Sequence, residues 1–328
     1  MISRRYLLSR LTMVAAGGAM LWAIRDRLPW PPAEVAFESG ERSGWIPLTN
    51  RGSMIEIPGT VNGVPIRVVV DSGAQMTAID RGLAQRLQLP QTAGALPLLA
   101  FGVTGAPTIS HTVKLQLGLP GLAVSDLRAA VLDLEGLGKL TGRPFSMLLG
   151  RDVLRHLALE IDYPRRRVAF HRTGGQAPTL DAITLPLKVV GGAPTLQVRV
   201  DGSDPINVLV DTGASTSLAL SQDAARKAGL LAPGRASTTA HSISLGGLSL
   251  DQVVVAQTVD VGGLTLRETP VQIYVPAARG KAPDGLLGAG LLRRYLTVLD
   301  LGAGQLFLVP QTPTIATGVE VGRVRPRP

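Results

Sequence analysis

Short apolar runs that stop at turn residues recur along the chain, and they predict buried strands. Residues 66–70 and 206–210 are rich in β-branched side chains, and an Asp-Ser/Thr-Gly turn follows each run. Continuous apolar runs of this kind are typical of strands that are buried on both faces. The stretch from Val113 to Leu117 alternates apolar and polar residues instead, which indicates a half-exposed strand.

Helical patterns are few and short. A polar residue at the start of an apolar-periodic segment is a typical N-cap, because its side chain accepts a hydrogen bond from the first helical turn. The expected helices cover residues 81–87, 152–157, 222–228 and 289–295, the first capped by Asp80 and the third by Ser221. Together with the strand patterns, they predict an all-β fold with a few short helices.

The second half of the chain repeats the first. Val-Asp-Ser-Gly-Ala around Asp71 matches Val-Asp-Thr-Gly-Ala around Asp211, 140 residues later. A Leu-Leu-Gly element and the segment after it recur at a separation of 138: Leu148, Leu149 and Gly150 match Leu286, Leu287 and Gly288, and residues 154–162 match 292–300. Matches in one order at nearly constant spacing predict two homologous β-barrel lobes related by a pseudo-two-fold axis.

The repeat divides the chain into segments. We expect an export signal or membrane anchor over 1–27, a spacer over 28–50, a first lobe over 51–171, a linker over 172–183, a second lobe over 184–310 and a basic tail over 311–328. Each lobe also carries a glycine-bearing segment between its aspartate and its Leu-Leu-Gly element, at residues 100–111 and 239–249. Glycine-rich hairpin tips are mobile, so we expect at least one of them to form a flap over the aspartates.

The chemistry of the repeat lies at its two aspartates. A buried strand that ends in Asp-Ser/Thr-Gly places a carboxylate at the edge of a core, where burial requires compensating hydrogen bonds. Gly73 and Gly213 allow the backbone to turn sharply and approach that carboxylate. If the lobes pack about an axis through these loops, Asp71 and Asp211 face each other. Two facing carboxylates share one proton, so that one serves as a general base and the other as a general acid.

At these residues the chain resembles the aspartic proteases. The two Asp-Ser/Thr-Gly-Ala segments are similar to that family's active-site signature, and the Leu-Leu-Gly elements resemble the strand that threads behind the active-site loop. Alanine after the glycine, and the Gly150–Asp152 segment, are closer to the retropepsin-like branch than to the pepsin branch. Neither expected flap contains a tyrosine, which also disfavours the pepsin branch. The resemblance covers about 260 residues.

The resemblance implies a function and a set of site residues. It implies an endopeptidase that hydrolyses peptide bonds with an activated water, without a metal, a cofactor or a covalent intermediate. Asp71 and Asp211 would be catalytic, and Ser72, Gly73, Thr212 and Gly213 would support their loops. The substrate would be a peptide or protein. Both lobes lie in one chain, so no oligomer is required.

Two other functions fit parts of the pattern. Asp211-Thr-Gly-Ala-Ser-Thr is similar to a phosphate loop of duplicated actin-like kinases, but no long helical segments separate the strands and the Leu-Leu-Gly elements stay unexplained. A catalytically silent peptide-binding or scaffold protein on the same fold fits every motif. Turnover of a denatured protein substrate distinguishes this scaffold from an enzyme.

Composition and charge exclude several classes of protein. The chain has no cysteine, which excludes disulfide scaffolds, thiolate metal sites and cysteine nucleophiles. Its net charge of +9 is concentrated in the two ends. Residues 1–27 and 320–328 hold eight of the 33 basic residues and two of the 24 acidic ones, which leaves 25 basic and 22 acidic residues between them. With aromatic residues at only 4%, no nucleic-acid partner is expected.

The N-terminus predicts export. Ser3-Arg4-Arg5 precedes a run of fourteen uncharged residues, from Leu11 to Ile24, and Arg25 closes the run. A basic segment followed by a moderately apolar one is typical of an export signal, and the paired arginines resemble the twin-arginine signal of bacteria. We therefore expect the protein in the bacterial periplasm or cell envelope. An uncleaved segment would tether it to the membrane.

Overall fold

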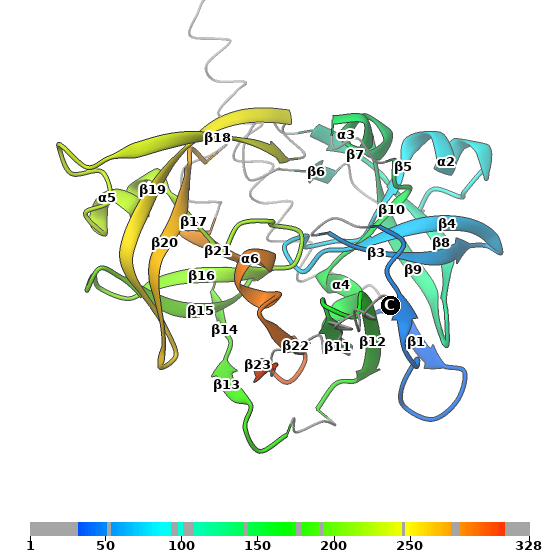
Figure 1. Ribbon diagram of the computed structural model, residues 1–328. Helices are drawn as coiled ribbons and strands as arrows, with labels where there is room; N and C mark the ends of the chain where they lie inside the picture. The colour runs from blue at the N-terminus through cyan, green and yellow to red at the C-terminus, as the bar shows by residue number, and fades with distance from the viewer. Residues whose placement is uncertain are drawn as a thin grey trace, which may run out of the picture.

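The computed structural model describes residues 32–50, 54–92, 98–100, 108–140, 144–174, 179–190, 193–244, 247–276 and 283–311. These residues form two β-barrel lobes and a sheet to which both lobes contribute (Figure 1). The predicted all-β, two-lobe fold is therefore confirmed. The predicted export signal and residues 312–328 of the predicted basic tail lie outside the described residues.

The first lobe is a closed barrel in the order β9-β5-β10-β4-β3-β8, because β8 pairs back to β9. Strand β1 adds to the outside of β9, and β6 and β7 form a separate hairpin. The strands are β1 (Glu34–Phe37), β3 (Ile55–Val61), β4 (Val64–Val70), β5 (Ala78–Asp80), β6 (Leu98–Ala100), β7 (Thr108–Ser110), β8 (Thr112–Leu119), β9 (Leu122–Leu132) and β10 (Met147–Leu149).

The second lobe closes in the same order, β20-β17-β21-β16-β15-β19, through the pairing of β15 with β19. Strand β14 pairs with the outer side of β15, and β18 pairs with the outer side of β19. The strands are β14 (Lys188–Val190), β15 (Ala193–Val200), β16 (Ile206–Asp211), β17 (Leu218–Ser221), β18 (Ser237–Ser244), β19 (Gly247–Val261), β20 (Leu264–Tyr274) and β21 (Gly285–Gly288). The two halves of the sequence repeat therefore fold into barrels with the same strand order.

A six-stranded sheet joins the lobes, with three strands from each half of the chain. Its order is β13-β23-β22-β11-β12-β2: β2 (Ile46–Pro47), β11 (Leu157–Asp162), β12 (Arg167–Arg172), β13 (Ile183–Pro186), β22 (Tyr295–Asp300) and β23 (Gln305–Pro310). At its centre β11 and β22 run antiparallel with Glu160 opposite Val298. These two residues are 138 apart, the spacing of the sequence repeat, so the pseudo-two-fold axis passes through this pair.

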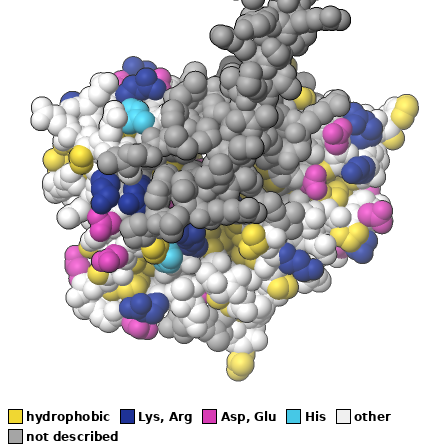
Figure 2. Space-filling view, turned by 180° about the vertical axis from the view of Figure 1, so that it is seen from behind, with side chains coloured by type: hydrophobic (Ala, Val, Ile, Leu, Met, Phe, Trp, Pro, Cys, Tyr) yellow, Lys and Arg dark blue, Asp and Glu magenta, His cyan; other side chains and the backbone are white. Residues whose placement is uncertain are grey.

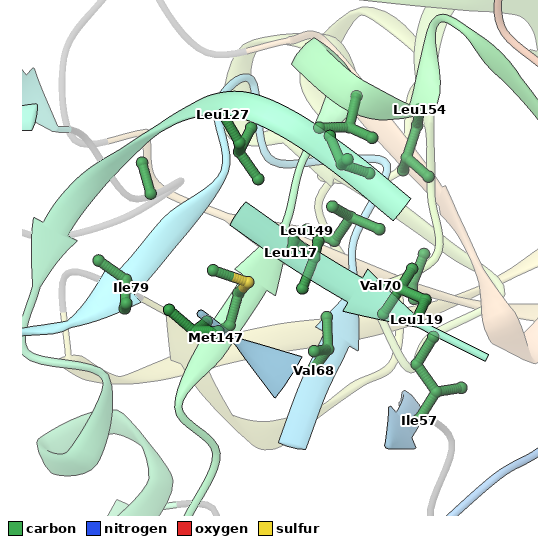
Figure 3. Close-up of a cluster of buried hydrophobic side chains, with 14 of the residues drawn as sticks. Ile57, Val68, Val70, Ile79, Leu117, Leu119, Leu127, Met147, Leu149 and Leu154 are labelled. Carbon is green, nitrogen blue, oxygen red and sulfur yellow. The ribbon is translucent and has the colours of Figure 1, made fainter. Parts of the chain in front are cut away.

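Each barrel encloses its own apolar core. In the first lobe the apolar runs of β4 and β10 meet side chains of β8 and β9 in the barrel interior, where Val68, Leu117 and Leu149 are all fully buried (Figure 3). Val208, Val210 and Leu287 lie in the equivalent core of the second lobe. Of the runs predicted to be buried on both faces, every residue of 68–70 and of 208–210 is buried. The prediction is wrong for the start of the first run, where Ile66 is half-buried and Arg67 is exposed.

The described residues contain five short helices: α2 (Arg81–Arg86), α3 (Leu134–Leu140), α4 (Arg151–Leu154), α5 (Gln222–Lys227) and α6 (Ala289–Leu292). The side chains of Asp80 and Ser221 cap α2 and α5 as predicted. Helices α4 and α6 end three residues earlier than predicted, because the residues that follow enter the shared sheet as β11 and β22. No pattern predicted α3. None of the helices in the described part of the chain is long and apolar enough to cross a membrane.

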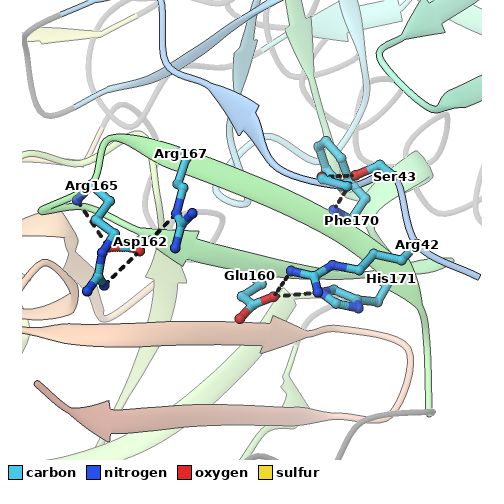
Figure 4. A network of polar contacts seen from close by, with 9 residues as sticks. Arg42, Ser43, Glu160, Asp162, Arg165, Arg167, Phe170 and His171 are labelled. Atoms are coloured by element: carbon cyan, nitrogen blue, oxygen red, sulfur yellow. Dashed lines mark hydrogen bonds and ion pairs between the residues drawn. The ribbon is translucent and has the colours of Figure 1, made fainter.

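The stretch predicted as a spacer contains two strands, because β1 pairs with β9 and β2 pairs with β12. A polar network also fastens this stretch to the shared sheet (Figure 4). Arg42 forms an ion pair with Glu160, which also binds His171 at 2.7 Å. The guanidinium groups of Arg42 and Arg167 both lie over the ring of Trp45, 4.9 and 4.1 Å from its centroid. Residues 34–47 therefore form part of the first lobe's packing rather than a free connection.

Candidate active site

Asp71 and Asp211 occupy matching places at the ends of two buried strands. Asp71 follows β4 directly, and Asp211 is the last residue of β16. The Leu-Leu-Gly strands run parallel to them, β10 beside β4 and β21 beside β16. The amide of Asp71 donates to the carbonyl of Leu149 at 3.0 Å. The Leu-Leu-Gly strands thus pair directly beside the strands that carry the aspartates.

The glycines of these elements are required by close backbone packing. A Cβ on Gly150 would lie 2.6 Å from the carbonyl carbon of Met76, and one on Gly288 would lie 2.4 Å from the carbonyl oxygen of Thr216. Both contacts are to backbone atoms, which cannot turn aside as a flexible side chain does. Any other residue would push the Leu-Leu-Gly strand away from the loop that it supports.

Each aspartate is held by the loop that follows it. The amides of Gly73 and Ala74 donate to Oδ1 of Asp71 at 2.8 and 3.2 Å. In the second lobe, Gly213 and Ala214 donate to Oδ1 of Asp211 at 2.8 and 3.1 Å. One oxygen of each carboxyl is therefore fixed by two backbone donors, and the other oxygen is left for a partner outside the loop.

The glycine of each loop packs against the carboxyl of the other lobe. A Cβ on Gly73 would lie 2.5 Å from Cγ of Asp211, and one on Gly213 would lie 2.8 Å from Cγ of Asp71. The bare backbone at these two positions thus lets the carboxyl groups approach each other. The structure brings together the two aspartates that the sequence placed 140 residues apart.

The two hydroxyl residues tie the loops together across the pseudo-two-fold axis. Ser72 Oγ donates to the carbonyl of Val210 at 2.8 Å and accepts from the amide of Thr212 at 3.0 Å. Thr212 Oγ1 donates to the carbonyl of Val70 at 3.0 Å and accepts from the amide of Ser72 at 3.0 Å. Both residues are fully buried. These four bonds fix the distance between the strands that carry the aspartates.

The environment makes both carboxyl groups harder to ionise. Burial raises the pKa of Asp71 and of Asp211. The negative charge of Asp71 and a side-chain hydrogen bond between the two carboxyls raise the pKa of Asp211 further. That hydrogen bond, the backbone amides and the positive charge of Arg151 act against the rise for Asp71. The pair therefore retains one proton over a wide pH range.

Three further side chains near the dyad were not singled out by the sequence motifs. Tyr163 lies between β11 and β12 and packs against both barrel cores, and Tyr274 ends β20. Burial and the charge of Asp211 both contribute to raising the pKa of each tyrosine. Arg151 begins α4 beside the loop of Asp71. A comparison of residues 138 apart would have shown that the second half has alanine at the position of Arg151.

The predicted flap segments are hairpins in both lobes. Strand β6 pairs with β7, and residues 101–107 between them lie outside the described residues. In the second lobe Ser242 pairs with Ser249 across the β18–β19 hairpin. Strand β18 contacts α3 of the first lobe, and it extends across the top of the molecule toward that helix (Figure 1). The hairpin of the second lobe thus bridges the two lobes.

The described residues offer no group of three or more His, Asp or Glu side chains that could hold a metal ion. The dyad itself offers the chemistry of its carboxyl groups: one proton to give, one lone pair to accept a proton, and a rigid frame around both. This arrangement can deprotonate a water molecule and protonate a carbonyl oxygen at the same time.

Comparison with known proteins agrees with this geometry. The family model described as aspartyl protease matches the chain twice, over residues 57–153 and 196–291. Each match spans one barrel from its first hairpin to the helix after Leu-Leu-Gly. The two matches together cover more than half of the chain, and they support the duplication independently of the strand order.

Individual relatives match over a shorter length. Protein DDI1 homolog 1 of Rattus norvegicus is 31% identical over 155 residues, which are 46% of this chain and 35% of that protein. The Homo sapiens protein of that name is 31% identical over 140 residues, or 41% of this chain and 32% of its own length. Protein DDI1 homolog 2 of Mus musculus is 30% identical over 139 residues, with shares of 41% and 32%. The alignments thus span about a third of the length of these relatives.

Proposed function

This chain belongs to the aspartyl protease family, and we propose that it is an aspartic endopeptidase in which Asp71 and Asp211 activate a water molecule. The observation that carries the proposal is the pair of carboxyl groups, each seated against the glycine of the other lobe and held by two backbone amides of its own loop. The duplicated family match and the DDI1 relatives support the retropepsin-like branch. The substrate would be a peptide or protein.

The catalytic roles follow from the shared proton. The ionised carboxyl takes a proton from water as the water oxygen attacks the peptide carbonyl carbon, and the protonated carboxyl gives its proton to the carbonyl oxygen. Activity is lost at low pH when the base is protonated and at high pH when the acid ionises. A bell-shaped profile on the acidic side of neutral is therefore expected, with limbs that belong to the pair.

Replacement of either aspartate tests the proposal. Asp71→Asn and Asp211→Asn each keep the shape and one acceptor oxygen but remove the shared proton. Each should lower the turnover of a denatured protein substrate by about 10²–10⁴-fold. The double variant should be little worse, because residues that act as one unit do not contribute additively. A peptide inhibitor with a central hydroxyl should bind the native pair and lose affinity for each variant.

Asp223→Asn is the matched control, since it removes an exposed carboxylate from α5 and should leave turnover unchanged. If the two dyad variants hydrolyse the substrate at the wild-type rate, the catalytic assignment is wrong. If the wild-type protein shows no turnover at any pH, the proposed endopeptidase function is wrong, and a catalytically silent peptide-binding or scaffold function is indicated instead.

We also propose that the protein is exported to the bacterial envelope. The support is the sequence of the N-terminus, where Arg4 and Arg5 precede a weakly apolar segment. Exchange of both arginines for lysine keeps the charge and should leave the protein in the cytoplasm, as measured by cell fractionation. Normal export of the double variant would indicate a general signal or a simple anchor instead.

A further inference from the structure

The β18–β19 hairpin of the second lobe carries a buried carboxylate. Asp251 is 5% exposed, and its Oδ2 accepts from Ser242 Oγ at 2.7 Å and from Gln272 Nε2 at 2.6 Å. Ser249 Oγ donates to Oδ1 at 3.3 Å. All of these donors are neutral, and none of the ion pairs among the described residues includes Asp251. A buried carboxylate without a cation is unfavourable, so a positively charged ligand would be stabilised at this cluster.

The cluster lies on the face of the second barrel that carries the dyad loop. Ile273 belongs to the barrel core, so its neighbours Gln272 and Tyr274 point to the opposite, outer face of the barrel. Tyr274 belongs to an apolar cluster against which Ala214 packs, and the amide of Ala214 donates to Asp211. Strand β18 also contacts α3 of the first lobe. The carboxylate bound by Gln272 therefore shares a face with the loop of Asp211, where the hairpin meets the first lobe.

The first lobe has an apolar residue at the place of Gln272. Ala130 on β9 pairs with Ala78 on β5. In the second lobe Gln272 on β20 pairs with Ala219 on β17. Because Ala78 and Ala219 both lie opposite the first leucine of their Leu-Leu-Gly element, Ala130 and Gln272 occupy matching places.

The place of Asp251 differs between the lobes as well. Asp251 is two residues before the strand partner of Gln272. Ser110 is two residues before the strand partner of Ala130, so it is the counterpart of Asp251. Ser110 Oγ donates to the carbonyl of Val131 at 2.6 Å and carries no charge. The matching faces of the two lobes are thus uncharged in the first lobe and anionic in the second.

We propose that Asp251 determines substrate specificity by selecting a lysine or arginine side chain on the second-lobe side of the scissile bond. This proposal rests on the proposed protease function. The ammonium or guanidinium group binds the carboxylate of Asp251 in a charge-assisted hydrogen bond, while Ser242, Ser249 and Gln272 hold that carboxylate in place. At the position equally far on the other side of the scissile bond, the uncharged face at Ala130 favours an apolar side chain.

Cleavage of a peptide library, randomised at one position at a time, tests the preference in the wild-type protein. One position should favour lysine or arginine, and its counterpart across the scissile bond should favour an apolar residue. A library without any preference for a basic residue overturns the proposal, and this measurement requires no variant.

A matched pair of peptides then assigns the preference to Asp251. Lysine and norleucine at the selected position are similar in length and differ in charge. Asp251→Asn keeps the shape of the side chain and should lower kcat/KM for the lysine peptide by roughly 10- to 100-fold, with little change for the norleucine peptide. Asp260→Asn, near the other end of β19, is the control and should change neither value. An equal loss for both peptides would show that Asp251 only supports the hairpin and would overturn the proposal.

A binding measurement separates this proposal from the protease function. Isothermal titration calorimetry on Asp71→Asn measures the affinity for both peptides without cleavage. The lysine peptide should bind more tightly than the norleucine peptide, and Asp71→Asn combined with Asp251→Asn should lose this difference. Equal affinities in Asp71→Asn would overturn the proposal even if the wild-type protein is a protease. A difference that depends on Asp251, in a protein whose wild type shows no turnover, would contradict the protease function and leave Asp251 as a binding site for basic peptides.

Discussion

At the scale of the residue, the site depends on the absence of a side chain at two glycines. Gly73 and Gly213 have no side chain, and the opposing carboxyl group occupies the space where a Cβ would lie. Each carboxyl is therefore packed against the loop of the other lobe, and each obtains two amide donors from its own loop. Such close packing favours a pair with one proton and disfavours a pair with two negative charges.

The buried pair makes folding stability depend on pH in a defined direction. Because the pKa of Asp211 is raised in the folded protein, the folded state keeps a proton that the unfolded chain releases above its ordinary pKa of 3.8. Stability is then fully present below pH 3.8 and is lost as pH rises through the raised pKa. Asp211→Asn removes this loss, so its melting temperature should increase relative to wild type as pH rises. Thermal scans from pH 3 to 8 test this, with Asp223→Asn as control; a constant difference would contradict it.

At the scale of the element, the aspartate loops are joined by two buried hydroxyls. Ser72 and Thr212 each satisfy an amide and a carbonyl of the opposite lobe, so no backbone group at this crossing depends on water. The resemblance implied that Ser72 and Thr212 support their loops. It did not indicate that each makes two hydrogen bonds to the opposite lobe.

Loss of one hydroxyl should therefore be costly. Thr212→Val keeps the volume but leaves the amide of Ser72 and the carbonyl of Val70 buried without this partner. Each such group costs about 1–3 kcal/mol, so the free energy of unfolding should fall by roughly 2–6 kcal/mol. Thr212→Ser keeps the hydroxyl and should lose less than about 1.5 kcal/mol. Urea denaturation measures both variants, and equal stabilities would show that the crossing bonds contribute little.

At the scale of the whole molecule, the lobes share a sheet as well as a site. Three strands from each half meet at the β11–β22 pair, where the register places Glu160 opposite Val298. The network of Arg42, Glu160 and His171 lies on this sheet and ties the N-terminal strands to it (Figure 4). On the face seen in Figure 2, basic and acidic side chains of the described residues lie interspersed.

Because both lobes depend on this sheet, we expect them to unfold together. Leu159 and Leu299 are opposed on β11 and β22 and are each 1% exposed. Leu159→Ala should lower the stability by about 2–5 kcal/mol and move a single calorimetric transition without splitting it. Leu117→Ala, in the first barrel far along the chain from the shared sheet, should move the same transition. A second transition in either variant would show that the lobes unfold independently.

The sequence by itself determined the parts of this protein that depend on local pattern and on repetition. Apolar runs ending in Asp-Ser/Thr-Gly, the Leu-Leu-Gly elements and a near-constant spacing were enough to predict the all-β, two-lobe fold and to indicate that Asp71 and Asp211 face each other. They did not single out Tyr163, Tyr274 or Arg151. The tertiary structure alone decided what depends on contacts between distant segments. Strands β1 and β2 form because β9 and β12 offer edges to pair with, α4 and α6 end early because the shared sheet takes up the next residues, and the carboxyls meet because each packs on the other lobe's glycine.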